Sequence, residues 1–338
     1  MTGIRLTPLR VALGIAVLII ATLVILYRLP SGEYILLPDV AHPVAPLVEV
    51  KGAKTPKGAG TIYFVDVFER QARELDTVFP WLHPHATFLP GNEVVPPGST
   101  GNAVIQAELR EMSMSQRVAA AVAERKLGYP VVIHPDGVLV NVLDLGTSAA
   151  RKLESADVIQ GVNGTATPTL AKLRSFMSRV TPGQAVTLKI LRGAKTLSAR
   201  VRTFALRQDP KRALIGFEPA QAAQITLPVR VTIQAGGIGG PSAGLAFALE
   251  VMQQLGANVT HGHDVAATGE MELDGSVAPI GGVKQKTYGV REAGADVFLV
   301  PAGQNAKDAR RYAGPLKIIA VRSLAQALHA LATLPPGR

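Results

Sequence analysis

The chain has 338 residues, of which 47% are hydrophobic and none is cysteine, and it carries a formal net charge of +10. A chain of this length and apolar content is expected to form two or three domains with buried cores. A sequence without cysteine excludes disulfides, thiol nucleophiles and cysteine-ligated zinc or iron–sulfur clusters. A nucleophile in this chain must therefore be a hydroxyl, a carboxylate or an amine.

The positive charge is concentrated in residues 130–205, where ten Lys and Arg against four Asp and Glu give +6. Aromatic residues make up only 5% of the chain and do not alternate with basic ones in the way that base-stacking surfaces require. No nucleic-acid partner is expected. The basic stretch instead favours acidic peptides or a membrane surface as its surroundings.

Residues 11–27 contain no charged side chain over seventeen positions, and the range 11–28 predicts a transmembrane helix. Arg5 and Arg10 precede it, so the positive-inside rule places residues 1–10 in the cytoplasm and the body of the protein outside the cell membrane. A cleaved signal peptide is the alternative. The length of the apolar run and the sequence Arg28-Leu29-Pro30, which stands where small residues would mark a cleavage site, favour a single-pass anchor.

The range 29–129 is expected to be an extracytoplasmic segment of strands and one helix, with no role assigned to residues 61–126. Its first half, up to residue 60, is rich in Pro and Gly and predicts a linker that merges into short strands. A strand is predicted at 61–67 and irregular structure at 80–101. Apolar residues at three- to four-residue spacing predict a helix over 107–126 that ends at Gly128.

Short elements and tight turns follow one another through residues 130–205. Strands are expected at 131–134, 138–142, 186–191 and 197–201, and a helix at 170–179. This order resembles a PDZ domain of the bacterial type, and the matching segments are Gly137-Val138, Ser148-Ala149, Asp157-Val158-Ile159, Val162-Asn163-Gly164 and Pro182-Gly183.

The PDZ resemblance implies a groove in which a peptide adds as a strand, here along Asp136, Gly137, Val138 and Leu139. Two departures weaken this expectation. Ala156 stands where the family has glycine, and Asp136-Gly137 replaces a glycine-rich carboxylate-binding loop. A role of the PDZ-like domain as a spacer therefore stays open.

A glycine-rich loop carries the best candidate nucleophile, Ser242. The loop follows an alternating apolar strand at 229–233, reads Ala235-Gly-Gly-Ile-Gly-Gly-Pro-Ser-Ala-Gly244, and precedes an apolar helix that ends at Gly256. Free backbone N–H groups at such a helix start can stabilise an oxyanion. Gly239, Gly240 and Ala243 are the expected contributors. The loop also resembles a phosphate cradle, but a small-molecule kinase would need a second serine and a magnesium-binding block, which we do not find.

Histidine is the most common base for a catalytic serine. The segment His261-Gly-His263-Asp264 lacks the helical spacing of a metal-binding pair, so no metal site is expected. Glu270, Glu272 and Asp274 alternate along one segment and are expected on a solvated strand face. These residues supply no convincing partner for a serine.

A lysine is the remaining candidate base. Lys284 follows the turn Pro279-Ile-Gly-Gly-Val and begins a helix that is expected to end at Gly294. An amine in an apolar setting near a helix N-terminus favours its neutral form, which can accept a proton from serine. Lys286, two residues further on, is expected to project elsewhere as a surface charge.

The three blocks Gly240-Pro-Ser-Ala-Gly244, Thr268-Gly-Glu270 and Pro279-Ile-Gly-Gly-Val-Lys284 resemble the proteolytic domain of the Lon protease family in order and spacing. The resemblance covers residues 210–338. It implies a Ser–Lys dyad, carried over to Ser242 and Lys284, with the Thr268 hydroxyl holding the lysine amine. With the PDZ-like region and the anchor, the whole chain is similar to membrane-anchored, PDZ-containing Lon-like proteins of Gram-positive bacteria.

The expected fold class is α+β multidomain, comprising an N-terminal transmembrane helix, a PDZ-like β-rich domain and a Lon-type α/β proteolytic domain. The chain contains no GxxxxGK[ST] phosphate loop, which predicts an ATP-independent serine endopeptidase that needs no cofactor and acts on flexible or unfolded extracytoplasmic polypeptides. A non-catalytic PDZ scaffold or peptide-binding protein is the alternative. The substrate, the PDZ peptide preference and any homo-oligomer stay open.

Overall fold

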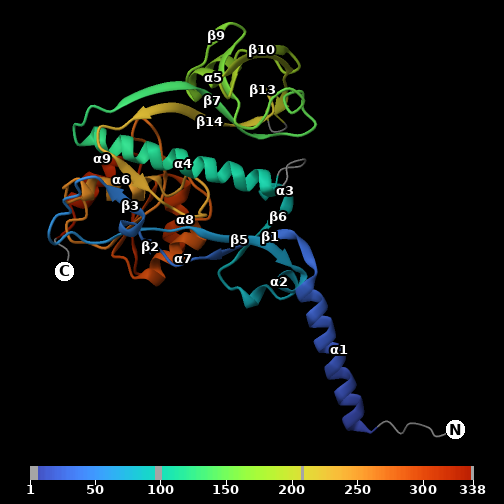
Figure 1. Ribbon diagram of the computed structural model, residues 1–338. Coiled ribbons are helices and arrows are strands. Elements are labelled where there is room, and N and C mark those ends of the chain that lie inside the picture. The colour runs from blue at the N-terminus through green and yellow to red at the C-terminus, as the bar shows by residue number, and fades with distance from the viewer. Residues whose placement is uncertain (1–6, 96–100, 207–208, 336–338) are drawn as a thin grey trace.

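The computed structural model of the chain describes residues 7–95, 101–206 and 209–335. It consists of an isolated N-terminal helix, a layered α/β body and a β-rich lobe above that body (Figure 1). The α+β, multidomain class expected from the sequence is confirmed.

The N-terminal helix α1 (Pro8–Arg28) stands away from the body, and none of its residues is buried (Figure 1). Within the described residues it is the single helix that is long and apolar enough to cross a membrane. Its 21 residues correspond to about 31 Å at 1.5 Å per residue, close to the thickness of a bilayer core. Arg5, one of the two arginines that predict the orientation of the helix, lies outside the described residues.

The body is built around a five-stranded sheet in the order β2-β4-β16-β19-β20. Strand β4 pairs in parallel with β16, and β16, β19 and β20 continue in parallel, whereas β2 is antiparallel to β4. The strands are β2 (His42–Pro43), β4 (Ile62–Phe64), β16 (Val265–Ala267), β19 (Val297–Pro301) and β20 (Lys317–Val321).

Helices cover both faces of this sheet, as expected for buried parallel strands. Apolar side chains of α4, α6 and α9 share one core with Ile62 and Leu299, and those of α7 and α8 share a second core with Phe298 and Val300. The helices are α4 (Gly101–Lys126), α6 (Gly244–Gln254), α7 (Val283–Ala293), α8 (Gln304–Tyr312) and α9 (Leu324–Ala332).

The range 29–129, predicted as a segment separate from the proteolytic domain at 210–338, is in the structure part of the same body. Ile62 pairs with Val265 in the central sheet, and Met112 and Val122 of α4 lie in the core of α6. Strand β3 (Val48–Val50) also pairs with β15 (Val231–Ile233), close to the glycine-rich loop. The prediction failed because pairing across about 200 residues leaves no local pattern in the sequence.

The Pro- and Gly-rich stretch expected as a linker forms ordered structure beside α1. A three-stranded antiparallel sheet has the order β5-β1-β6, with β1 (Pro30–Pro38), β5 (Val67–Arg73) and β6 (Thr87–Pro90). Short helices α2 (Glu74–Val78) and η2 (Pro80–Leu82) connect β5 to β6, α3 (Gly91–Val94) follows β6, and η1 (Ala45–Leu47) precedes β3. Residues 96–100 of the region expected to be irregular lie outside the described residues.

The upper lobe has its own core, formed by Val138, Ile159, Leu188 and their neighbours. Its sheet has the order β11-β10-β8-β7-β14, with β9 beside β8 and the separate hairpin β12-β13. The elements are β7 (Val132–Leu143), β8 (Val158–Val162), β9 (Thr165–Ala166), α5 (Leu170–Met177), β10 (Ala185–Arg192), β11 (Lys195–Arg202), β12 (Phe204–Leu206), β13 (Asp209–Leu214) and β14 (Phe217–Thr226).

The lobe is therefore an insertion into the body, because the chain enters through β7 and returns through β14. These two strands pair along ten positions and lie over α4 (Figure 1). The turn 135–137, expected to separate two strands, lies inside the continuous strand β7. Gly137 has a φ of 140°, and a Cβ there would lie 2.3 Å from the Ile159 carbonyl oxygen, so this position requires glycine.

Candidate active site

Ser242 lies in the loop between β15 and α6, and the structure fixes its backbone tightly. Its carbonyl oxygen accepts bonds from the Gly269 amide at 2.8 Å and from the Thr268 hydroxyl at 3.2 Å. The neighbouring Pro241 carbonyl accepts a bond from the Ser115 hydroxyl of α4 at 3.0 Å. Helix α6 begins at Gly244, two residues after the serine, whose side chain remains partly accessible.

The lysine that contacts Ser242 is Lys286. Its Nζ lies 2.6 Å from Ser242 Oγ and 3.3 Å from Thr268 Oγ1. Thr268 is fully buried, and its amide donates to the Leu299 carbonyl of the central sheet at 3.0 Å, so the threonine is anchored on a rigid element. A serine, a lysine and a threonine from three separate segments thus meet at one point.

Burial lowers the pKa of Lys286 from 10.5 to about 8, and the carboxylate of Asp66 opposes this effect. Only 4% of the lysine is exposed, and an ammonium in such a place loses its hydration. Near neutral pH a useful fraction of this amine is therefore neutral and able to accept a proton. This is the property that a general base for serine needs.

Lys284, predicted as the partner of Ser242, contacts another part of the molecule. Its Nζ donates to the Ala86 carbonyl at 2.8 Å, and it lies 6.0 Å from the centroid of the Tyr312 ring. Residues two apart on an α-helix lie about 200° apart, so Lys284 and Lys286 point from opposite faces of α7. The pairing of Ser242 with Lys284 and the surface position expected for Lys286 are both wrong.

The sequence contained a signal for the correct lysine. Val283, Lys286 and Val290 follow the three- to four-residue spacing of a helix face, and all three are buried. Gly282 and Gly289 border the same stripe. A Cβ at Gly282 would lie 2.6 Å from Val67 Cγ2, and one at Gly289 would lie 1.8 Å from the Asp39 carbonyl oxygen. The segments of Asp39 and Val67 therefore press closely against the face that carries Lys286.

The residues expected to form an oxyanion hole differ in whether their backbone N–H groups are free to donate to a substrate. The Gly240 amide donates to the Glu108 carbonyl of α4 at 3.0 Å, so it is engaged within the molecule. The amides of Gly239, Ser242 and Ala243 find no acceptor among the described residues. Gly239 also packs tightly on α4, where a Cβ would lie 2.8 Å from Glu108 Cβ.

The peptide-binding strand expected at residues 136–139 is already paired on both sides. Val138 and Leu139 lie opposite Ile159 and Val158 of β8 on one edge and opposite Gln221 and Ala220 of β14 on the other. Strand addition along these residues is therefore blocked in this structure, contrary to the expectation. The chain returns to the body by the edge that a peptide would need.

Gln221 fastens β14 in that position. Its side-chain nitrogen donates to the carbonyls of Gly137 and Pro168 at 3.0 and 3.1 Å, and its side-chain oxygen accepts from the Leu170 amide at the start of α5. Strand β14 thus lies against both β7 and α5.

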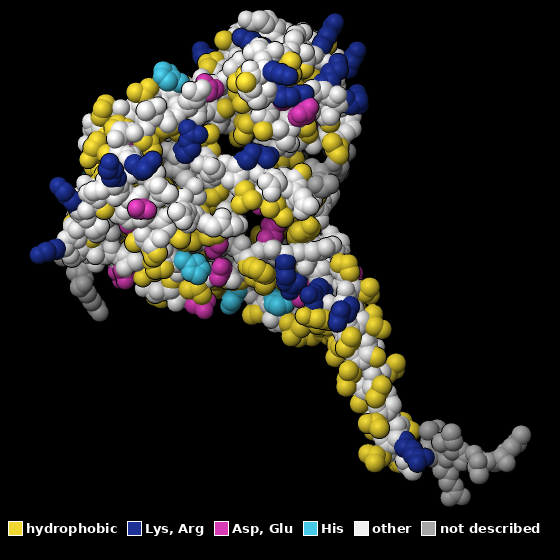
Figure 2. All heavy atoms as spheres, in the orientation of Figure 1, with side chains coloured by type: hydrophobic (Ala, Val, Ile, Leu, Met, Phe, Trp, Pro, Cys, Tyr) yellow, Lys and Arg dark blue, Asp and Glu magenta, His cyan; other side chains and the backbone are white. Residues whose placement is uncertain are grey.

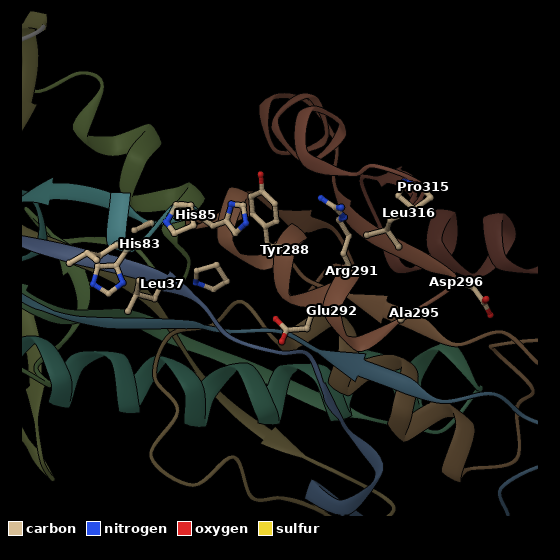
Figure 3. Close-up of a pocket in the computed structure, with 15 residues that line it drawn as sticks. Leu37, His83, His85, Tyr288, Arg291, Glu292, Ala295, Asp296, Pro315 and Leu316 are labelled. Atoms are coloured by element: carbon tan, nitrogen blue, oxygen red, sulfur yellow. The ribbon is translucent and has the colours of Figure 1, made fainter. Parts of the chain in front are cut away.

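A separate pocket of about 930 Å³ lies on the outer side of α7. Figure 3 shows Tyr288, Arg291 and Glu292 of α7 among the residues that line it, together with His83 and His85. The rings of His85 and Tyr288 stack with centroids 3.8 Å apart. None of Ser242, Thr268 and Lys286 lines this pocket, so it is distinct from the serine–lysine contact.

The histidine segment 261–264 is engaged in structural contacts. His263 Nε2 lies 2.7 Å from the Pro335 carbonyl oxygen, and Asp264 accepts a bond from the Thr61 amide at 3.0 Å. Among the described residues, the group with the geometry to hold a metal ion is Asp39, His42 and Asp66, which sequence analysis did not single out.

The alternating carboxylates are less solvated than expected. Burial, reinforced by Glu272, raises the pKa of Glu270 to about 7. Glu111 of α4 has its pKa raised to about 7 as well, first by burial and then by Glu218, Glu270 and Glu108. Glu270 and Glu272 are half-buried, so the solvated face predicted for them is wrong, and α4 lies against the segment of Glu270; Asp274 is exposed, as expected.

Comparison with protein families identifies the two lobes. Residues 198–332 match the Lon protease (S16) C-terminal proteolytic domain, and residues 123–203 match the PDZ domain. The chain thus combines a Lon-type proteolytic domain with a PDZ domain, which confirms the resemblance drawn from its motifs. The body described above extends beyond the Lon match to residues 44–123.

The chain is similar to Lon proteases from several bacteria. It is 30% identical to the Lon protease of Roseiflexus castenholzii over 218 residues, which is 60% of this chain and 25% of that protein. It is 35% identical to Lon protease 1 of Sorangium cellulosum over 109 residues, which is 29% of this chain and 13% of that protein. The chain therefore spans a quarter or less of the length of these relatives.

Among solved structures, the chain is similar to the PDZ domain of the SdrC-like protein of Listeria monocytogenes. The identity is 22%, the match covers 25% of this chain and 88% of that one, and the TM-score is 0.24. The solution structure of GtR34C from Geobacillus thermodenitrificans matches at 23% identity, covers 25% of this chain and 97% of that one, and has a TM-score of 0.23.

Proposed function

We propose that this protein is a membrane-anchored serine endopeptidase that uses Ser242 as its nucleophile and Lys286 as its general base. The observation that carries the proposal is the 2.6 Å contact between Ser242 Oγ and the Nζ of a buried lysine. The lowered pKa of Lys286, about 8, supports the role of a base.

In the proposed reaction, Lys286 accepts the proton of Ser242 Oγ while that oxygen attacks a peptide carbonyl carbon. The ammonium then donates the proton to the leaving amine, and an acyl-enzyme remains on Ser242. Lys286 next takes a proton from water, which hydrolyses the ester and restores the serine. Thr268 holds the amine in place through its hydroxyl, 3.3 Å away.

The oxyanion of each tetrahedral intermediate needs hydrogen-bond donors. The amides of Gly239, Ser242 and Ala243, which have no acceptor among the described residues, are the proposed donors. Gly240 is a weaker candidate than the sequence suggested, since its amide donates to the Glu108 carbonyl.

The proposed substrates are flexible or unfolded polypeptides on the extracytoplasmic side, cleaved without ATP. The lack of a phosphate loop in the sequence supports ATP independence, and α1, with Arg10 in its first turn, supports an anchor with the body outside. The position of β14 favours a regulatory or positioning role of the PDZ domain over peptide capture. The same observation disfavours the alternative of a non-catalytic peptide-binding scaffold.

The test combines covalent labelling with proteolysis. The full chain in detergent is treated with a fluorophosphonate probe and, separately, with an unstructured polypeptide in the absence of nucleotide. We expect one labelled site, Ser242, with both labelling and cleavage lost in Ser242→Ala and retained in Ser198→Ala, which changes an exposed serine of the PDZ domain. Cleavage that survives Ser242→Ala would refute the proposed nucleophile.

A further inference from the structure

A group of large apolar side chains lies exposed where α1 joins the body. Val78, Trp81 and Leu82, at the end of α2 and in η2, are 49%, 67% and 54% exposed, and Phe79 packs edge-on against Trp81 with ring centroids 5.0 Å apart. We call these four residues the aromatic wedge. Figure 2 shows hydrophobic side chains gathered on the underside of the body at the point where α1 leaves it.

The wedge is held at a fixed place relative to the end of α1. The amide of Glu74, the first residue of α2, donates to the Leu29 carbonyl at 3.0 Å. The Arg73 guanidinium lies 3.9 Å from the centroid of the Tyr27 ring. The last turn of α1 and the start of α2 are therefore in direct contact.

A buried ion-pair network makes this segment rigid. Asp76, 6% exposed, accepts two bonds from Arg70 at 2.7 and 3.1 Å, one from the Arg73 amide at 2.8 Å, and lies 3.0 Å from His83 Nε2. The Arg70 guanidinium holds the pKa of Asp76 well below its usual range. The carboxylate of Asp76 thus points inward, and Val78, Trp81 and Leu82 of the same segment are left facing outward.

We propose that the aromatic wedge inserts into the interfacial region of the same bilayer that α1 spans. The proposal rests on the anchoring proposed above. Since the length of α1 matches a bilayer core, Arg28 at its C-terminal end marks the level of the headgroups, and the wedge lies beside that end. Tryptophan and tyrosine are favoured at this depth, and Arg28 and Arg73 offer charge to anionic headgroups.

The wedge would give the body a second attachment to the membrane besides α1. With one contact, the body could rotate and tilt about Leu29. With two, the active site is held at a set height and orientation above the lipid surface. The lipid interface is therefore the proposed binding partner of the aromatic wedge. Contact of the wedge with a second copy of the chain or with another protein would be a different result of the test.

Trp81 is the only tryptophan in the sequence, so its fluorescence reports on the wedge alone. The full chain is reconstituted into phosphatidylcholine–phosphatidylglycerol vesicles, with or without lipids brominated near the headgroup end or deep in the acyl chain. We expect a blue-shifted emission, protection from acrylamide, and quenching that is stronger with the shallow bromines than with the deep ones. The matched control is Trp81→Phe combined with Leu197→Trp, which moves the probe to the PDZ domain and should show no quenching by lipid.

Each other outcome overturns the inference in a distinguishable way. If the protein floats with the vesicles but Trp81 stays accessible to acrylamide and is insensitive to brominated lipid, the anchor stands and the wedge is wrong. A blue shift without quenching by lipid means that protein covers Trp81. If the protein fails to float with the vesicles, the anchoring proposal fails and the inference fails with it.

Discussion

Helix α7 has two faces that carry one lysine each, and the difference between them decides which lysine can do chemistry. The inner face places Lys286 between Val283 and Val290, 4% exposed and in contact with Ser242. The outer face places Lys284 on the Ala86 carbonyl, beside the pocket of His85 and Tyr288. Both residues are lysines and lie two positions apart on the same helix. Their environment, and not the residue type, therefore decides which of them can act as a base.

The largest expected effect on cleavage comes from replacing Lys286, with the same replacement of Lys284 as its control. Lys286→Met should lower kcat/KM for an unstructured polypeptide by about 10²–10⁴-fold or more, because the proton acceptor for Ser242 is lost. Lys284→Met, its matched control on the other face, should change kcat/KM less than about threefold. Steady-state cleavage assays on the two variants check this, and equal losses would erase the distinction between the faces.

The tight packing of the inner face can be tested at Gly289. A Cβ there would lie 1.8 Å from the Asp39 carbonyl oxygen, so Gly289→Ala should cost about 1–3 kcal/mol in the free energy of unfolding, despite the better helix propensity of alanine. Gly281→Ala is the control, since no atom lies within 4 Å of its added Cβ. Thermal melts of both variants decide the matter, and an unchanged Gly289→Ala melting temperature would contradict the packing.

The pH dependence of cleavage should follow the neutral form of Lys286. Its pKa is lowered to about 8, so the fraction of neutral amine falls about tenfold for each pH unit below that value, and it saturates above it. The rate kcat/KM should therefore rise with pH and level off above about 8. A profile that is flat between pH 6 and 8 would argue against lysine as the base.

A smaller effect is expected from Asp66, whose carboxylate raises the pKa of Lys286 and so opposes burial. The Oδ1 atom of Asp66 is buried without a hydrogen-bond partner among the described residues. Asp66→Asn removes a negative charge that favours the ammonium, so the acidic limb of the pH profile should move to lower pH. Glu49→Gln, an exposed change on β3, should leave the limb in place. A shift to higher pH would contradict the assigned sign.

Much of the site was predictable from local patterns. The glycine-rich loop identified Ser242, the Thr-Gly-Glu block identified Thr268, and Gly294 ends α7 with a φ of 74° as expected. The glycine turn favours Lys284, the lysine nearest to it, whereas the buried apolar stripe of the helix carries Lys286. The periodicity of Val283, Lys286 and Val290 carried the information that the turn did not.

Long-range arrangements were not predictable in this way. The pairing of Ile62 with Val265 and the electrostatic effect of Asp66 on Lys286 join segments about 200 residues apart, so no spacing in the sequence records them. The pairing of strand β14 with the edge of β7 was likewise not predictable from the sequence. Residues Gln221 and Ala222 of β14 read as an ordinary polar and apolar pair, and their function as a strand partner appears only once the PDZ domain is seen as an insertion.

The most direct test of the central claim is to titrate the Lys286 amine itself. Heteronuclear NMR of the full chain labelled at lysine Cε and Nζ should show one lysine titrating near pH 8, with its resonance absent in Lys286→Arg and retained in Lys284→Arg. Its shift should also change in Ser242→Ala, which removes the oxygen 2.6 Å from Nζ. If the resonance of a lysine that titrates near pH 8 persists in Lys286→Arg, or is missing from the unmodified protein, Lys286 is not the base.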